Sequence, residues 1–176
     1  MVEYAQERQG LDRPEVPRGA DERTMLTAML DWHRATFAAK LDGLTAQQLS
    51  AKAAPPSQLS LHGLTRHLAG VERWWFRIQL SGEQLPLLYY TDDDPDLDFE
   101  GLSDDPFADR DVWQAECRAS RSAVDAFDSL DELSRASRRG EQFSLRWLLL
   151  HLVAEYARHN GHADLLREHL DGTTGY

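Results

Sequence analysis

The chain has a single cysteine, Cys117, among its 176 residues. No disulfide can form within one molecule, and a cysteine-rich zinc site is excluded, so any metal would have to be bound by histidines and carboxylates. Cys117 falls in a stretch with helical periodicity, DVWQAECRASRSAVDAF, and we expect it to be a small buried or half-buried residue there rather than a nucleophile.

Long apolar runs are also missing. None approaches the roughly 20 residues that a membrane-spanning helix needs, and residues 1–19 lack the apolar centre of a signal peptide. We therefore expect a cytoplasmic protein without a membrane partner. The formal net charge is −11 and no basic stripe interrupts it, which argues against a nucleic-acid partner.

Sustained alternation of apolar and polar residues, the pattern of a β-strand, does not occur either. Apolar residues instead recur at three- and four-residue steps in four long segments, which predicts amphipathic helices. Residues 1–19 are expected to form an irregular tail, and residues 20–176 one domain. The fold class predicted is all-α, a four-helix bundle with one long acidic crossover loop between the second and third long helices. The predicted helices cover residues 22–42, 61–82, 109–130 and 145–171.

The crossover concentrates the negative charge. Residues 92–111 contain ten acidic residues against one base, Arg110. The spacing of Asp94, Asp96 and Asp98 resembles the start of a calcium-binding loop, but the sixth and twelfth positions counted from Asp94 hold neither the glycine nor the glutamate that an EF-hand requires. We therefore interpret the segment as a solvated acidic loop.

The last predicted helix places polar residues where its core-facing stripe should be apolar. At about 100° per residue, Glu155 and His159 fall in the middle of the stripe formed by the leucines, and His162 falls on its edge. Residues i and i+4 stack on one helix face, so Glu155 and His159 could both reach one ion. A charged glutamate in a core is costly unless it is paired or binds a metal.

A third ligand would have to come from another helix. His67 lies on the edge of the apolar stripe of the second helix, beside Trp74, and Glu72 borders the other side of that stripe. His33 lies in the middle of the stripe of the first helix. The predicted metal ligands are His67, Glu155 and His159. Further candidates for the pocket or for residues behind the ligands are His33, Glu72, His162 and Trp74.

Two histidines and one carboxylate leave open coordination positions, a pattern that suits catalytic zinc or non-haem iron(II). Two interpretations without a metal stay open: a buried Glu–His hydrogen-bonded pair, or an Arg–Glu pair between helices.

Three stretches resemble the DinB-like superfamily, a set of four-helix-bundle metalloenzymes related to the YfiT-like proteins and to mycothiol-dependent maleylpyruvate isomerase. These stretches are PPSQLSLHGLTRHLAGVERWWF, LYYTDDDPDLDF and FSLRWLLLHLVAEYARHNGHADLLREHLDGTTG. The resemblance covers nearly the whole chain from about residue 20. It implies a divalent metal, often zinc or nickel, held by one histidine of the second helix and an HxxxH pair in the last. His67 matches the first, and Glu155 replaces the first histidine of the pair that ends at His159.

The resemblance also implies a reaction. Relatives use a metal-bound low-molecular-weight thiol, such as mycothiol, in transfer or isomerisation. We therefore expect a divalent-metal-dependent enzyme of the thiol-transferase or isomerase type, with a thiol or electrophile as its small-molecule partner. The alternative is a bundle that binds a metal or small ligand without turnover, as a stress-response or interaction module. Exposed helix faces make a homodimer a further expectation.

Overall fold

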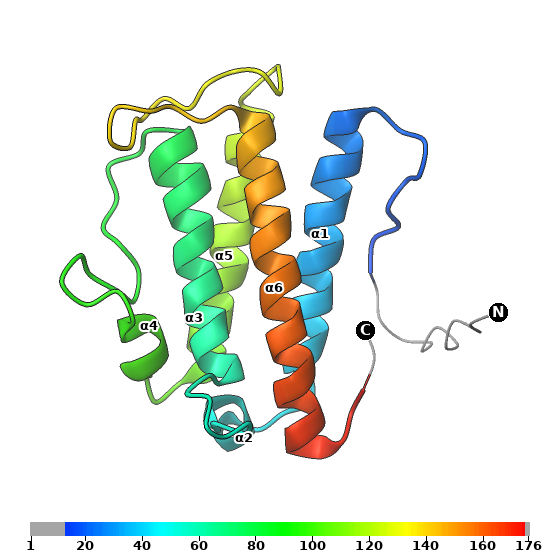
Figure 1. The fold of residues 1–176 in the computed structure, drawn as a ribbon, viewed down its shortest axis with the longest axis vertical. Coiled ribbons are helices and arrows are strands. Elements are labelled where there is room, and N and C mark those ends of the chain that lie inside the picture. The colour runs from blue at the N-terminus through cyan, green and yellow to red at the C-terminus, as the bar shows by residue number, and fades with distance from the viewer. Residues whose placement is uncertain (1–12, 175–176) are drawn as a thin grey trace.

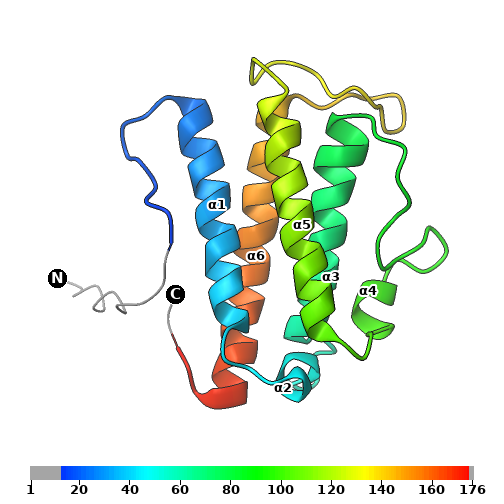
Figure 2. The ribbon, with the colours of Figure 1, turned by 180° about the vertical axis from the view of Figure 1, so that it is seen from behind.

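The computed structural model describes residues 13–174, and this part of the chain is built from helices, with only isolated bridges and no strand. Four long helical segments lie side by side, and this confirms the predicted all-α class (Figures 1 and 2). In chain order the elements are α1 (Glu22–Leu41), α2 (Ala46–Ser50), α3 (Leu61–Glu72), η1 (Arg73–Leu80), α4 (Leu97–Glu100), α5 (Pro106–Asp125) and α6 (Leu145–Asp171). None of these described helices is long and apolar enough to cross a membrane.

Capping residues explain where several helices begin and end, because they satisfy backbone N–H groups or adopt a conformation that stops the helix. The Ser60 and Ser144 side chains accept hydrogen bonds from the backbone N–H groups of the first turns of α3 and α6. Thr45 caps α2 in a reciprocal arrangement with Gln48. Gly172 ends α6 with a φ of 74°, a left-handed conformation that glycine adopts without strain.

The second long helix departs from the regular periodicity used to predict its buried face. It continues from α3 into the π-helix η1, where the backbone N–H of Ser81 donates to the carbonyl of Phe76, five residues back. The wider turn rotates the later side chains, so Phe76 and Leu80 are fully buried while Ile78 is only half-buried. A uniform step of about 100° per residue places Ile78 on the apolar stripe with Leu64, Leu68 and Trp75.

Most acids of the crossover are exposed, as expected from its composition, but Asp98 and Asp109 are buried. The crossover contains α4, which lies beside α3 (Figure 1), and Asp98 within α4 is only 2% exposed. Gly63 permits this approach, because a Cβ atom there would lie 3.2 Å from Cδ1 of Phe99. Gly70 permits a similarly close approach nearer the C-terminal end of α3, where a Cβ atom would lie 3.1 Å from Cε1 of Tyr90. The missing side chains let the crossover pack directly against the helix.

A buried carboxylate connects all four long helices. Glu72 at the end of α3 is 0% exposed and accepts two hydrogen bonds of 2.7 Å from the guanidinium of Arg34 on α1. The hydroxyl of Tyr156 on α6 donates to the same carboxylate at 2.7 Å. The thiol of Cys117 on α5 lies 3.5 Å from it, and Trp113, also on α5, donates its indole N–H to the Tyr156 hydroxyl. We call these five residues the Glu72 network.

The network favours the charged form of Glu72 although the residue is buried. Burial alone would raise the pKa of this carboxyl, but the charge and hydrogen bonds of Arg34 lower it below its ordinary value. Burial raises the pKa of the Cys117 thiol, so Cys117 is a protonated, buried residue, as its position in the sequence predicted.

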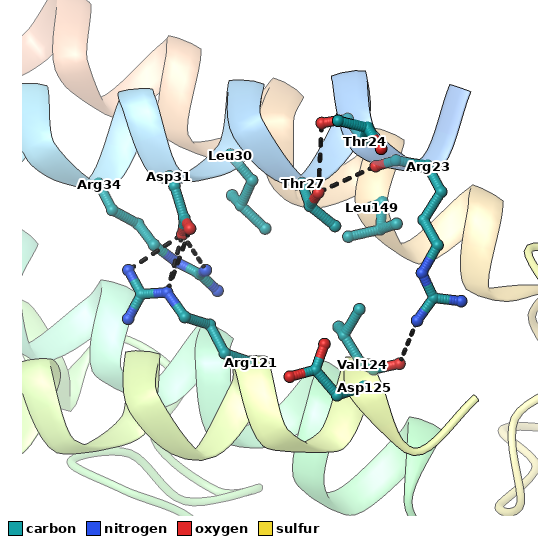
Figure 3. A pocket seen from close by; sticks show the side chains of 10 residues that line it. All are labelled: Arg23, Thr24, Thr27, Leu30, Asp31, Arg34, Arg121, Val124, Asp125 and Leu149. Carbon is teal, nitrogen blue, oxygen red and sulfur yellow. Dashed lines mark hydrogen bonds and ion pairs between the residues drawn. The ribbon is translucent and has the colours of Figure 1, made fainter. Parts of the chain in front are cut away.

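A cavity of about 300 Å³ lies between α1 and α5 (Figure 3). Three arginines line it, and each is already engaged: Arg121 with Asp31, Arg34 with Glu72 and Asp31, and Arg23 with the backbone carbonyl of Val124. The guanidinium groups of Arg34 and Arg121 are thus paired with carboxylates, whereas that of Arg23 is held by neutral backbone carbonyls.

Glu72→Gln is expected to destabilise the fold strongly. The amide keeps the shape of the side chain but leaves the Arg34 charge buried without its main counter-charge, which typically costs about 3–5 kcal/mol. Urea denaturation followed by circular dichroism measures the loss of unfolding free energy, with Glu168→Gln on the exposed face of α6 as the control. A loss below about 1 kcal/mol would contradict the structural role of the network.

Candidate metal centre

The three predicted ligands come together between α3 and α6. One ligand atom from each of His67, Glu155 and His159 can be chosen so that all three atoms lie within 4.8 Å of one another. The His67 ring, on α3, meets the His159 ring, on α6, edge to face with 4.7 Å between the centroids. Two helices therefore supply the candidate ligands, and Glu155 and His159 supply theirs from adjacent turns of one face.

His159 is neutral in this environment. The residue is only 7% exposed, and burial, reinforced by the nearby His67 and His162, lowers its pKa to about 3. A neutral imidazole keeps a lone pair on one ring nitrogen, which is the form that binds metals.

Glu155 makes only loose contacts with the charged or ionisable side chains around it. Its carboxylate oxygens lie 3.4 Å from Nε2 of His159, 3.8 Å from Arg158 and 4.0 Å from Nε2 of His151. These separations exceed ordinary hydrogen-bond lengths, so a tightly hydrogen-bonded Glu–His pair is not what the structure contains. Two ligands of one tetrahedral ion, each bound at about 2.1 Å, are about 3.4 Å apart. The Glu155–His159 separation fits that arrangement.

His67 is oriented by the crossover. Its Nδ1 atom lies 2.8 Å from Oδ2 of Asp98, and its ring stacks on Phe99 with 5.0 Å between the centroids. A carboxylate on one imidazole nitrogen is a common arrangement behind metal-binding histidines, because it leaves the other nitrogen available to the ion. The donor set and its surroundings therefore fit a divalent metal.

A cavity of about 470 Å³ opens beside His67. Its lining combines aromatic residues, among them the consecutive tryptophans of η1, with aspartates of the crossover and two arginines of the loop before α6. The lining residues whose side chains could contact a ligand by stacking or by polar contacts include His67, Trp74, Trp75, Tyr90, Asp98, Phe99 and Arg138. Trp74 thus lines the cavity, as its place beside His67 suggested, and the π-helical turn is what presents two successive tryptophans there.

Of the remaining predicted site residues, some lie at the cluster of His67, Glu155 and His159 and others do not. His162 lies at the cluster, with its Nδ1 atom 3.4 Å from Nδ1 of His159. His33 and Glu72 are not brought into it. Asn160 contacts His33 through its side-chain amide, and Glu72 is held by Arg34. Glu72 is thus part of an ion pair between α1 and α3 and not of the cluster.

The sequence analysis missed one participant, Asp98, which it grouped with the solvated acids although this residue contacts His67. His151 lies at the edge of the cluster, half-buried and stacked on Trp147. The Asp-x-Asp-x-Asp spacing marked the right segment, but no pattern in the sequence shows which of its acids turns inward.

The family model that matches most of the chain identifies a helical protein of the DinB-like superfamily, as the resemblance implied. The model of the mycothiol-S-transferase family matches residues 25–172, and the chain belongs to this family.

A solved structure supports the fold. The crystal structure of a conserved protein from Enterococcus faecalis superimposes with a TM-score of 0.62 at 16% sequence identity, covering 88% of this chain and 100% of that one. At this identity the likeness concerns the fold alone. No curated protein matches the chain.

Proposed function

We propose that the protein is a divalent-metal-dependent thiol S-transferase in which His67, Glu155 and His159 bind the ion. The observation that carries the proposal is the convergence of these three donors, within 4.8 Å of one another, beside a cavity partly lined by aromatic residues. Membership of the mycothiol-S-transferase family supports a low-molecular-weight thiol, such as mycothiol, as one substrate. Zinc, nickel and iron(II) all suit two histidines and a carboxylate.

A divalent ion bound at this site would lower the pKa of a thiol that joins it, and thereby supply the thiolate nucleophile at neutral pH. The protein's own residues supply the ligands and part of the compensating charge. His67 and His159 contribute neutral nitrogens, and Glu155 contributes a negative charge that partly neutralises the ion. With three protein ligands, a position is left for the substrate sulfur.

The cavity beside His67 is suited to hold the second substrate. Trp74 and Trp75 offer flat apolar surface for an electrophile with an apolar body. Arg138 lies over both indole rings, 5.8 Å and 5.9 Å from their centroids. In the transfer, a carbon–sulfur bond forms, the leaving group departs from the same carbon, and the proton of the thiol passes to solvent.

Divalent metal is expected to raise the melting temperature of protein purified without a histidine tag. At a free concentration one hundred times Kd, binding to the native state adds about 2.7 kcal/mol, equivalent to roughly 5–10 °C for a domain of this size. Differential scanning calorimetry with Zn²⁺, Ni²⁺ and Fe²⁺ measures the shift. Glu155→Gln and His159→Ala should remove it, and Glu168→Gln should keep it. Wild-type protein that does not respond to any of the three ions would contradict the proposed site.

Turnover is tested with mycothiol and a fluorogenic haloalkyl electrophile. We expect a metal-dependent rate well above the uncatalysed background. His159→Ala should lower it by more than the roughly 10–100-fold typical of losing an outer-shell partner, because it removes a ligand itself. Metal binding without any rate above background, over a panel of thiols and electrophiles, would instead favour a binding module.

A further inference from the structure

Asp98 is a buried carboxylate that contacts the candidate metal centre but is not one of its three candidate ligands. It is 2% exposed, and its Oδ2 atom lies 2.8 Å from Nδ1 of His67. Its other oxygen, Oδ1, is buried without a hydrogen-bond partner in the described part of the chain. A carboxylate buried with so little compensation is costly, so its position calls for a functional reason.

The neighbouring arginine does not neutralise this carboxylate. Arg66 directs its guanidinium to the backbone carbonyls of Asp98, at 3.1 Å, and of Leu97, at 3.4 Å, and it pairs with the side chain of Asp109. The side-chain contact that the structure gives the Asp98 carboxylate is with Nδ1 of His67. The hydrogen-bond partner of this carboxylate therefore lies at the candidate metal centre.

The structure also holds Asp98 firmly in place. The two bonds from Arg66 fix the backbone of α4 on α3, and Phe99 packs on both the His67 ring and the surface left open by Gly63. A short helix in an acidic crossover is thus anchored at the point where one of its carboxylates meets a candidate ligand.

We propose that Asp98 is a positioning residue for His67. It accepts the Nδ1–H of the neutral imidazole and so leaves the lone pair on Nε2 for the ion shared with Glu155 and His159. This rests on the proposed function, because the ion is the reason for directing Nε2. In general, such outer-shell carboxylates set the tautomer and orientation of a ligating histidine, and their loss typically costs 10–100-fold in metal affinity.

The first test needs no metal. A long-range nitrogen–proton correlation spectrum of the histidine rings, recorded on chelator-treated full-length protein at pH 8, shows which ring nitrogen carries the proton. His67→Gln assigns the signal. We expect wild-type His67 to carry its proton on Nδ1 alone. Asp98→Asn should move part of the population to the Nε2–H form, because an amide can either accept from Nδ1 or donate to it.

The second test measures zinc affinity by competition with a metal indicator. Asp98→Asn should weaken Kd by 10–100-fold. Asp94→Asn, which removes the same charge from an exposed position in the same crossover, should leave both Kd and the His67 tautomer unchanged.

The outcomes separate this inference from the proposed function. Wild-type protein that binds none of zinc, nickel and iron(II) contradicts the proposed function, while the spectrum still decides whether Asp98 sets the tautomer. Wild-type protein that binds zinc, with an unchanged Kd in Asp98→Asn, overturns only the role of Asp98. If Asp98→Asn does not fold, the wild-type spectrum decides alone: a proton on Nε2 of His67 overturns the inference, and one on Nδ1 supports it.

Discussion

The geometry of the candidate metal centre depends on one buried interaction, the convergence of Arg34 and Tyr156 on the carboxylate of Glu72. Because these partners come from α1 and α6, the carboxylate fixes how both helices sit along α3. Tyr156 directly follows Glu155 in α6, and Glu72 follows His67 in α3 by little more than one turn. The bond between Tyr156 and Glu72 therefore sets the register that places His67 opposite Glu155 and His159. A polar network in the core here determines which side chains can meet, a role that apolar packing, being non-directional, fills less specifically.

The chemistry of the centre is shaped by Glu155. The related pattern of three histidines would leave a divalent ion with its full charge of two, whereas one carboxylate reduces the charge of the loaded site by one. A thiolate would then bring the proposed complex close to neutrality. Asp98 adds a further negative charge behind His67. In the proposed complex both features would favour retention of the cation and would reduce how strongly it attracts electrons from the sulfur. A glutamate at position 155 in place of a histidine would therefore affect the nucleophilicity of the thiolate as well as the affinity for the metal.

The sequence predicted the parts of the fold that are governed by local rules. Capping residues such as Ser60, Ser144 and Gly172 act within a turn of their own position, and the helical period alone placed Glu155 and His159 on one face. The π-helical turn was beyond this reasoning, because a uniform step per residue cannot anticipate hydrogen bonds to the fifth residue back. Tertiary pairing was equally inaccessible: nothing near Glu72 in the sequence identifies Arg34 as its partner, and nothing near Asp98 distinguishes it from the exposed acids around it.

The central claim is that one ion joins α3 to α6 through His67, Glu155 and His159. A crystal structure of the zinc-loaded protein, with anomalous diffraction to locate the metal, tests it most directly. The account predicts one zinc ion bonded to a nitrogen of each histidine and to a carboxylate oxygen of Glu155, all at about 2.0–2.2 Å. Zinc bound elsewhere, or bound by the histidines while Glu155 stays outside the coordination sphere, would contradict it.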